Sequence, residues 1–367
     1  MKHLLFIIGD ELIIHPHYKD YIFRRYEEKF HEIDELKIQS KSDKELPFFL
    51  EKLTHSYDFI TIFSSPQNYS IIAKILATLS DDNLVLKEQT LVPDRSLSAA
   101  NSFVCALDAC RINLLNVDTS EKMPPLLGDV ALDYDFFCLF GIDEESALLL
   151  LETLTRSFKV NIKTSKLLEN LTLVKVISHE NGTIESFLQG VQKLFGAKVF
   201  LGKNPLNFIV SKLLERGLKI SFAESCTGGL CASMLTQIEG VSGIFEGSIV
   251  SYSNRLKHEW LGISEGILEG GGEYSERCVY FMLKGIFKTA KCDFALALSG
   301  VAGEGDEGGM KAGTILIGAM FRDGAYLQEI LHLRGDRPFI QKQAALAAFC
   351  LLLKLKPEIF NNLESHQ

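Results

Sequence analysis

The sequence predicts an α/β protein, because short apolar runs alternate with helical segments along much of its 367 residues. Leu4–Ile8 and Phe59–Phe63 are continuous apolar runs that end in Gly-Asp and Ser-Ser-Pro. Such runs are typical of strands buried on both faces of a parallel sheet. Helical spacing follows each run, over Tyr18–Ile33 and Ser70–Leu79. We therefore predict an α/β domain at the N-terminus and place it over residues 1–160.

A smaller unit is predicted after this domain. Phe136–Gly141 has the pattern of a buried strand and Glu144–Phe158 that of a helix, and both are assigned to the first domain. A strand, a helix and a strand follow over Leu171–Ser178, Ser186–Phe195 and Lys198–Leu201. They predict a small α+β connector over residues 161–203.

The C-terminal part, residues 204–360, is predicted to be a second α/β domain. Helices are expected over Leu206–Glu215, Leu230–Gln237 and Phe339–Leu353. Strands are expected over Lys219–Ala223, Ser248–Ser253, Phe294–Leu298 and Thr314–Met320. The first of these strands leads through a sharp turn, Glu224–Gly229, directly into a helix.

Composition and charge narrow the class of protein. Hydrophobic residues make up 47% and charged residues 23%, which is ordinary for a globular protein of two or three domains. The net charge of −9 argues against a nucleic-acid partner, since phosphate backbones need a basic face. The eight cysteines form no CxxC pair, so a zinc ribbon is not expected and a reducing cytoplasm fits best. No signal peptide or membrane span is expected from the apolar runs.

The turn Glu224–Gly229 is the most informative segment. Free N–H groups and the helix dipole at such a turn favour an anion, and Gly228 and Gly229 let a ligand approach the backbone. Ser225 could be a nucleophile with an oxyanion hole of turn N–H groups. Alternatively, Ser225 and Thr227 simply cap the helix. The segment alone leaves both interpretations open.

A second segment, Ser251-Tyr252-Ser253-Asn254, is followed by Lys257. A lysine that is desolvated in a pocket can lose its charge and act as the base that a serine nucleophile needs. Tyr252 could relay a proton or hold the lysine in place. A strand end with a solvated lysine is the simpler alternative.

Two further segments carry candidate binding residues. Ser299-Gly300-Val301-Ala302-Gly303 follows an apolar strand, a place suited to lining a pocket. Arg337 precedes the last helix and could clamp a phosphate or carboxylate. An ordinary surface pair with Asp336 is the alternative for Arg337.

Taken together and in this order, these segments resemble the CinA C-terminal domain, the nicotinamide mononucleotide deamidase family. The resemblance covers about residues 204–355 and is carried by 223–229, 247–254, Lys257, 261–263, 299–303, 313–314 and 335–337. It implies hydrolysis of the carboxamide of nicotinamide mononucleotide to nicotinate mononucleotide and ammonia, in pyridine-nucleotide salvage and without a cofactor. It also implies a homodimer.

The resemblance assigns roles to individual residues. Ser225 becomes the nucleophile, Lys257 the base and Tyr252 an assisting group. The substrate-binding residues that it implies are Glu224, Thr227, Gly228, Gly229, Ser242, Asn254, Ser299, Gly300 and Arg337. No metal ligand is among them.

The chain also departs from the family's pattern. Gly303-Glu304 stands where Gly-Pro is usual, and Gly272-Glu273-Tyr274-Ser275 where Gly-Ala-Val-Ser is usual. Lys311–Thr314 is one residue shorter than the usual Lys-Pro-Val-Gly-Thr. Glu304, Asp306 and Glu307 would weaken phosphate binding if their loop reaches the substrate.

The N-terminal half is similar to the molybdopterin-binding-like domain of full-length CinA proteins, which implies a three-layer fold. The similarity lies in Gly9-Asp10-Glu11-Leu12 and Gly141–Glu145. The glycine-rich loop of that domain is replaced by Phe63-Ser64-Ser65-Pro66-Gln67, so a degenerate site without pyrophosphatase activity is expected. Asp10-Glu11 and His15-Pro16-His17 could bind a metal, but a solvated turn and a loop are the simpler interpretations.

Two functions from different classes therefore compete. One is an amidohydrolase built on Ser225, Tyr252 and Lys257. The other is a non-catalytic, nucleotide-binding regulatory or scaffolding protein, suggested by the altered N-terminal half and the Glu304 loop. Ser225 and Lys257 within hydrogen-bond reach of each other favour the first.

Overall fold

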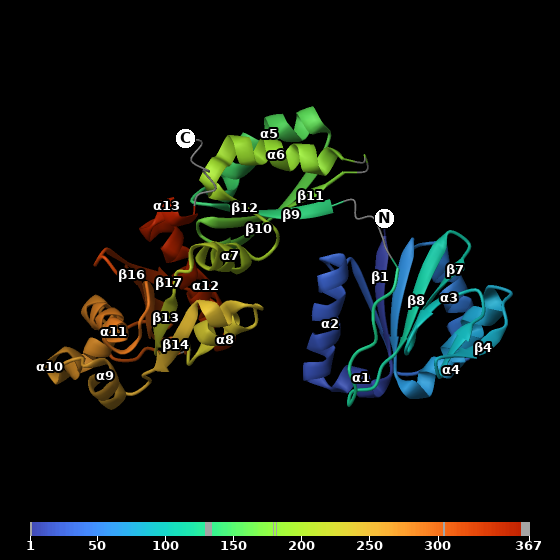
Figure 1. The fold of residues 1–367 in the computed structure, drawn as a ribbon, viewed down its shortest axis with the longest axis horizontal. Helices are drawn as coiled ribbons and strands as arrows, with labels where there is room; N and C mark the ends of the chain where they lie inside the picture. Colours follow the sequence, from blue (N-terminus) through green and yellow to red (C-terminus); the bar gives the residue numbers. More distant parts are fainter. Residues whose placement is uncertain (1, 129–133, 179, 181, 304, 361–367) are drawn as a thin grey trace. The chain divides into compact units, whose positions relative to one another are not determined.

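The computed structural model describes residues 2–128, 134–178, 180, 182–303 and 305–360. The chain divides into two compact units, Met1–Asp133 and Tyr134–Gln367. The division differs from the predicted boundary at residue 160. The second unit holds both the connector and the C-terminal domain, and each unit is coloured along the sequence in Figure 1.

The first unit is built on a six-stranded sheet in the order β2-β1-β3-β8-β7-β6. Its strands are β1 (His3–Ile8), β2 (Glu35–Gln39), β3 (Phe59–Ser64), β6 (Leu97–Ala99), β7 (Ser102–Leu107) and β8 (Cys110–Asn116). β2, β1, β3 and β8 are parallel to one another. β7 is antiparallel to β8, and β6 is antiparallel to β7. A separate ribbon pairs β4 (Leu84–Lys87) with β5 (Thr90–Pro93).

Helices cover both faces of this sheet. They are α1 (Asp10–Ile14), α2 (Pro16–Phe30), α3 (Leu46–Thr54) and α4 (Pro66–Leu79). Because successive strand residues point to opposite faces, Leu5 and Ile7 of β1 pack with Ile22 of α2. Leu4 and Phe6 pack on the other face, with α3 and α4. The three-layer α/β fold expected for this half is therefore confirmed (Figure 1).

The second unit begins with an antiparallel sheet in the order β10-β11-β9-β12. The elements are β9 (Tyr134–Phe140), α5 (Glu144–Phe158), β10 (Asn161–Leu168), β11 (Leu171–Ile177), α6 (Thr183–Phe195), η1 (Gly196–Lys198) and β12 (Val199–Leu201). β9 pairs with both β11 and β12, so it and α5 belong to the connector and not to the first domain. α5 and α6 cover one face, while Cys138 and Phe200 join the core of the C-terminal domain.

The C-terminal domain has a five-stranded sheet in the order β14-β13-β15-β16-β17. Its strands are β13 (Ile220–Glu224), β14 (Phe245–Val250), β15 (Phe294–Gly300), β16 (Thr314–Phe321) and β17 (Tyr326–His332). β14, β13 and β15 are parallel to one another. β16 is antiparallel to β15, and β17 is antiparallel to β16. The carboxyl ends of the parallel strands thus meet at one edge, where ligands bind in open α/β sheets.

Helices lie on both faces of this second sheet as well. One face carries α7 (Pro205–Arg216), α8 (Leu230–Thr236), α12 (Arg337–Leu355) and α13 (Pro357–Phe360). The other carries α9 (Asn254–Leu261), α10 (Glu265–Leu268) and α11 (Glu276–Thr289). The short 3-10 helices η2 (Val241–Gly243) and η3 (Glu269–Tyr274) complete the domain. By length and composition alone α12 could cross a membrane, but its apolar residues form much of this core.

Candidate active site

Ser225 stands at the carboxyl end of β13, in the turn that leads into α8. Its main-chain N–H donates to the Leu298 carbonyl of β15 at 3.0 Å, and its side chain is nearly buried. Gly228 and Gly229 follow with φ of 62° and 100°, a backbone region that favours glycine. These two glycines let the chain reverse tightly, and Ser225 is held at the sheet edge.

Lys257 reaches Ser225 from α9 and is 1% exposed. Its Nζ lies 3.0 Å from Ser225 Oγ, 2.9 Å from the Ser251 carbonyl oxygen and 3.0 Å from that of Tyr252. The two side chains that the sequence paired are therefore within hydrogen-bond reach in the structure. The alternative of a solvated lysine does not hold, because Lys257 is enclosed.

The electrostatics of Lys257 suit a base. Burial lowers its pKa from the ordinary 10.5, because the ammonium loses its hydration, while Cys278, Glu273 and Cys226 act in the opposite direction. Carbonyl oxygens only accept hydrogen bonds. A neutral Lys257 amine can thus donate its two N–H groups to Ser251 and Tyr252 and turn its lone pair toward Ser225 Oγ.

Cys226, the neighbour of Ser225, is a poor nucleophile by comparison. Burial raises the pKa of its thiol to about 12, so the reactive thiolate is scarce near neutral pH. Its carbonyl accepts a hydrogen bond of 2.7 Å from Gln341 Nε2, which fixes the turn against α12. Of the two adjacent side chains, Ser225 is the one that has a base beside it.

Glu224 corrects one expectation, because its own carboxylate occupies the anion site at the start of α8. The side chain is fully buried and accepts hydrogen bonds from Thr227 Oγ1 and Ser248 Oγ at 2.9 Å. It also accepts the N–H groups of Gly229, Cys231 and Ala232 at 3.0–3.1 Å. Glu224 and Thr227 therefore stabilise the turn by hydrogen bonds within the protein. The hydroxyl and N–H groups that donate to Glu224 are not available to a substrate anion.

Removing the Glu224 carboxylate is expected to destabilise the domain. Glu224→Ala should lower the free energy of unfolding by about 3 kcal/mol, because it leaves several buried donors without an acceptor. The only tryptophan, Trp260, lies on α9, so its fluorescence in urea reports this domain. Glu246→Ala, which removes a partly exposed ion pair with Lys219, is the control and should cost less than about 1 kcal/mol. Equal losses in the two variants would contradict the role of Glu224.

Tyr252 also differs from its expected role. The residue is 61% exposed, and its hydroxyl accepts a hydrogen bond of 3.0 Å from Arg337 Nη2. Only its main-chain carbonyl contacts Lys257. The phenol is therefore not placed to relay a proton between Ser225 and Lys257, and the residue positions Lys257 through its backbone.

Arg337 is the first residue of α12 and is exposed at the rim of the site. A Cβ added to Gly303 would lie 3.5 Å from its Nη1, so the guanidinium lies close to the loop after β15. Asp336 does not form the surface pair considered above, since its side chain accepts the Phe339 N–H at 3.0 Å and caps the helix. The geometry leaves the Arg337 guanidinium available to an anion.

Ser299, Gly300 and Asn254 are also near this edge but are engaged by the protein. Ser299 Oγ donates to the Glu273 carbonyl at 2.6 Å, and Asn254 Nδ2 donates to that of Leu268 at 3.5 Å. Gly300 has φ of 143°, and a Cβ there would lie 2.4 Å from the Thr314 carbonyl oxygen. These residues hold the walls of the site together.

Ser242 lies away from the site within one chain. It is exposed in η2, which precedes the first residue of β14. β13 and β14 are parallel, with Ile220 opposite Phe245 at the start and Glu224 opposite Val250 at the end. Ser242 is therefore at the opposite sheet edge from Ser225, which corrects its assignment to this chain's own pocket.

The acidic loop after Gly303 is described in part. Glu304 lies outside the described residues. Asp306 accepts the Ala312 N–H at 2.9 Å, and Glu307 pairs with Met310 through the main chain. Burial, followed by the charge of Glu307, raises the pKa of Tyr274 to about 12, so this loop lies close to η3.

The N-terminal candidates have structural roles in the part of the chain that is described. His15 Nδ1 accepts the Tyr18 N–H at 3.2 Å and caps α2, while Asp10 and Glu11 form the first turn of α1. A Cβ added to Gly9 would lie 2.7 Å from the Ser65 Cβ, so the two strand ends pack directly on each other. No cluster of three or more His, Cys, Asp or Glu residues that could hold a metal occurs among the described residues.

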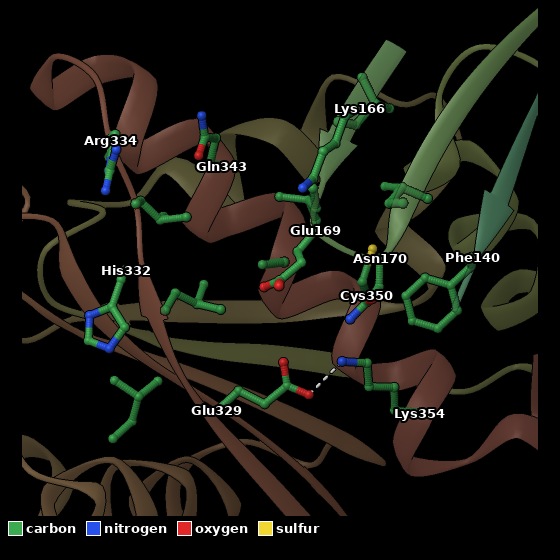
Figure 2. A pocket seen from close by; sticks show the side chains of 17 residues that line it. Phe140, Lys166, Glu169, Asn170, Glu329, His332, Arg334, Gln343, Cys350 and Lys354 are labelled. Atoms are coloured by element: carbon green, nitrogen blue, oxygen red, sulfur yellow. Dashed lines mark hydrogen bonds and ion pairs between the residues drawn. The ribbon is translucent and has the colours of Figure 1, made fainter. Parts of the chain in front are cut away.

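A separate cavity of about 490 Å³ lies between the β10–β11 turn and the β17–α12 face (Figure 2). Lys166 lines it from β10 and Glu169 from the turn, while His332 lines it from β17 and Arg334 from the residues after β17. An ion pair of 2.6 Å joins Glu329 to Lys354 on its wall. None of the site residues inferred from the sequence is among its lining residues.

Comparisons with known proteins match the C-terminal domain. The CinA C-terminal domain model matches residues 203–356. A nicotinamide-nucleotide amidohydrolase PncC from Enterobacter agglomerans is 40% identical over 154 residues, which is 42% of this chain and 93% of that protein. A CinA-like protein from Fervidobacterium nodosum is 42% identical over 141 residues, 38% of this chain and 34% of that protein. The match thus spans about a third of the latter's length.

Solved structures of similar proteins match the same region. The competence/damage inducible protein CihA from Agrobacterium tumefaciens has 30% sequence identity and a TM-score of 0.39. That match covers 41% of this chain and 92% of the other.

Proposed function

This chain belongs to the CinA family through its C-terminal domain, and from that premise we propose that it deamidates nicotinamide mononucleotide. The products are nicotinate mononucleotide and ammonia. One observation carries the proposal: Lys257 is buried with its Nζ 3.0 Å from Ser225 Oγ and its other contacts made to carbonyl oxygens. The similarity to the PncC amidohydrolase over 93% of that protein supports the same substrate.

In the first half of the reaction, Ser225 Oγ attacks the carboxamide carbon and its proton passes to the neutral Lys257 amine. The carbon becomes tetrahedral and its oxygen gains negative charge. The C–N bond then breaks, the Lys257 ammonium gives its proton to the departing nitrogen, and ammonia leaves. An ester between Ser225 and the nicotinoyl group remains.

In the second half, water attacks this ester and gives a proton to the Lys257 amine. The bond between the acyl carbon and Ser225 Oγ breaks, and Oγ takes the proton back from Lys257. The acid releases its remaining proton to the solvent and leaves as its carboxylate, and Ser225 and Lys257 return to their starting state. The scheme uses only side chains, main-chain groups and water, and the absence of a cofactor stays a prediction.

The developing oxyanion would be stabilised by main-chain N–H groups of the turn. The N–H groups of Cys226 and Thr227 donate to no protein oxygen within the described part of the chain. The N–H after a serine nucleophile is a common oxyanion donor, because it points to the same side as the attacking oxygen. Glu224 accepts the N–H groups of Gly229, Cys231 and Ala232, so the N–H groups of Cys226 and Thr227 remain available to the oxyanion.

Arg337 is expected to bind the phosphate of the nucleotide. Arg337→Met should raise KM for nicotinamide mononucleotide by about tenfold or more and change kcat less, because a lost phosphate contact affects substrate and transition state alike. KM for nicotinamide riboside, which has no phosphate, should hardly change. Arg334→Met, an exposed arginine three residues away, is the control. An equal effect on both substrates would contradict the assignment.

The proposal is tested by ammonia release from nicotinamide mononucleotide by the purified full-length chain. Steady release, with nicotinate mononucleotide as the second product, is expected. Tight binding of the nucleotide without ammonia release would instead favour the non-catalytic, nucleotide-binding alternative.

The cellular compartment and the oligomeric state of the protein are part of the same proposal. The eight cysteines are free and buried, which fits the reducing cytoplasm in which pyridine-nucleotide salvage would take place. The homodimer and the absence of nucleic-acid and membrane partners stay predictions.

A further inference from the structure

Glu273 has an unsatisfied carboxylate oxygen beside the site. Its Oε2 is buried and has no hydrogen-bond partner in the part of the chain that the structure describes. A buried carboxylate oxygen without a donor is costly, because it has lost water and gained nothing in return. The missing donor is therefore expected to come from a molecule that enters the site.

The backbone of Glu273 is fixed next to the nucleophile. Its carbonyl accepts the Ser299 hydroxyl at 2.6 Å, and Ser299 is the next residue after Leu298. Leu298 in turn accepts the Ser225 N–H at 3.0 Å. The segment that carries Glu273 is thus attached to the same strand end that holds Ser225.

The carboxylate also acts on the base. Burial is the largest influence on the pKa of Lys257 and lowers it, and the charge of Glu273 acts in the opposite direction, as does Cys278. Lys257 cannot be its missing donor, since Nζ already contacts Ser225 Oγ and two carbonyl oxygens. A group bound between Ser225 and Glu273 would meet the base and the free carboxylate oxygen together.

A primary carboxamide supplies what this oxygen lacks. Its NH₂ group has two N–H donors, whereas an ester or a carboxylate has none. The acid product places a negative charge where the amide had its NH₂ group, and two like charges in a buried site repel each other strongly. The same oxygen can therefore favour the substrate and disfavour the product.

We propose that Glu273 determines the specificity for the amide: its Oε2 accepts an N–H of the substrate carboxamide and repels the product carboxylate. The proposal rests on the proposed function and adds a residue to it. It also gives a role to the sequence Gly272-Glu273-Tyr274-Ser275, at which the chain departs from the pattern of the family it resembles.

The test compares two ligands in a background that cannot turn over. In Ser225→Ala, nicotinamide mononucleotide should bind at least about tenfold more tightly than nicotinate mononucleotide. Adding Glu273→Gln should abolish this preference, mainly by tightening the binding of the acid, because the amide side chain can donate to a carboxylate. Calorimetry gives both dissociation constants. Glu276→Gln, an exposed carboxylate in the first turn of α11, is the matched control and should keep the preference.

A pH profile separates this role from a merely structural one. With Ser225 intact, Glu273→Gln should move the acid limb of kcat/KM to lower pH, because the carboxylate no longer raises the pKa of Lys257. Trp260 fluorescence checks that the variant is folded. An unchanged ligand preference in a folded Glu273→Gln variant overturns the proposal, even if the wild type is active. Absence of ammonia release from the wild type would count against the proposed function, and the two-ligand comparison would still decide the role of Glu273.

Discussion

Replacing Ser225 with alanine is expected to lower kcat for ammonia release by about 10⁴-fold or more. The covalent route disappears with the hydroxyl, and Lys257 has no positioned proton to accept. The affinity for the nucleotide should stay close to that of the wild type, because the walls of the site are held by Glu224, Ser299 and the turn glycines. Single-turnover ammonia release, together with calorimetric binding, measures both quantities.

Ser242→Ala is the matched control for this prediction. Ser242 is another serine that the family resemblance assigned to the pocket, but it lies at the opposite edge of the sheet within one chain. Its replacement should change kcat by less than about threefold. A large loss in Ser242→Ala would mean that a second copy of the chain brings this residue to the site. Activity retained in Ser225→Ala would contradict the nucleophile assignment itself.

Replacing Lys257 with methionine is expected to lower kcat/KM by about 10³-fold. Methionine keeps most of the length and apolar character of the buried side chain but accepts no proton. Lys284→Met, on the exposed side of α11, controls for the loss of a positive charge and should have near wild-type activity. Activity of Lys257→Met within tenfold of the wild type would contradict the role of the lysine as the base.

The activity of the wild type is also expected to depend on pH through Lys257. Lys257 can accept a proton only as the neutral amine, so the activity of the wild type should rise as pH increases through the pKa of Lys257. Burial places that pKa below 10.5, so the rise begins at lower pH than for an exposed lysine. Any residual activity of Lys257→Met should lack this limb. The measurement is kcat/KM against pH for both proteins.

The sequence predicts best those elements that are buried on both faces. The apolar runs at β1, β3 and β15 were assigned correctly, because continuous apolar residues between turn signals have few alternatives to a central strand. The half-exposed edge strand β17 was not predicted, since its sequence, Tyr-Leu-Gln-Glu-Ile-Leu-His, has neither a continuous apolar run nor a strict alternation of apolar and polar residues. α11 was missed although Val279, Met282 and Ile286 have helical spacing. β9 pairs with β11 and β12, and no feature of its own residues indicates this, so the first domain boundary was placed too far along the chain.

In the candidate site, the sequence identifies the reactive residues but not how the side chains around them are arranged. The order of motifs was enough to select Ser225 and Lys257, which the fold brings together. It could not show that Glu224 fills the start of α8, because this depends on Ser248 approaching from β14. Nor could it show that the Tyr252 ring turns outward to Arg337. The free oxygen of Glu273 depends on how η3 folds over β15, and its only sign in the sequence is the departure at residues 272–275.

Trapping the acyl-enzyme shows whether Ser225 forms a covalent bond to the substrate. The wild-type chain is mixed with nicotinamide mononucleotide, quenched in acid within the first turnover, and analysed by peptide mass spectrometry. If Ser225 is the nucleophile, the peptide containing Ser225 gains the mass of the substrate less ammonia, and Ser225→Ala shows no such gain. Rapid ammonia release with no adduct, or with an adduct on another residue, would contradict this assignment.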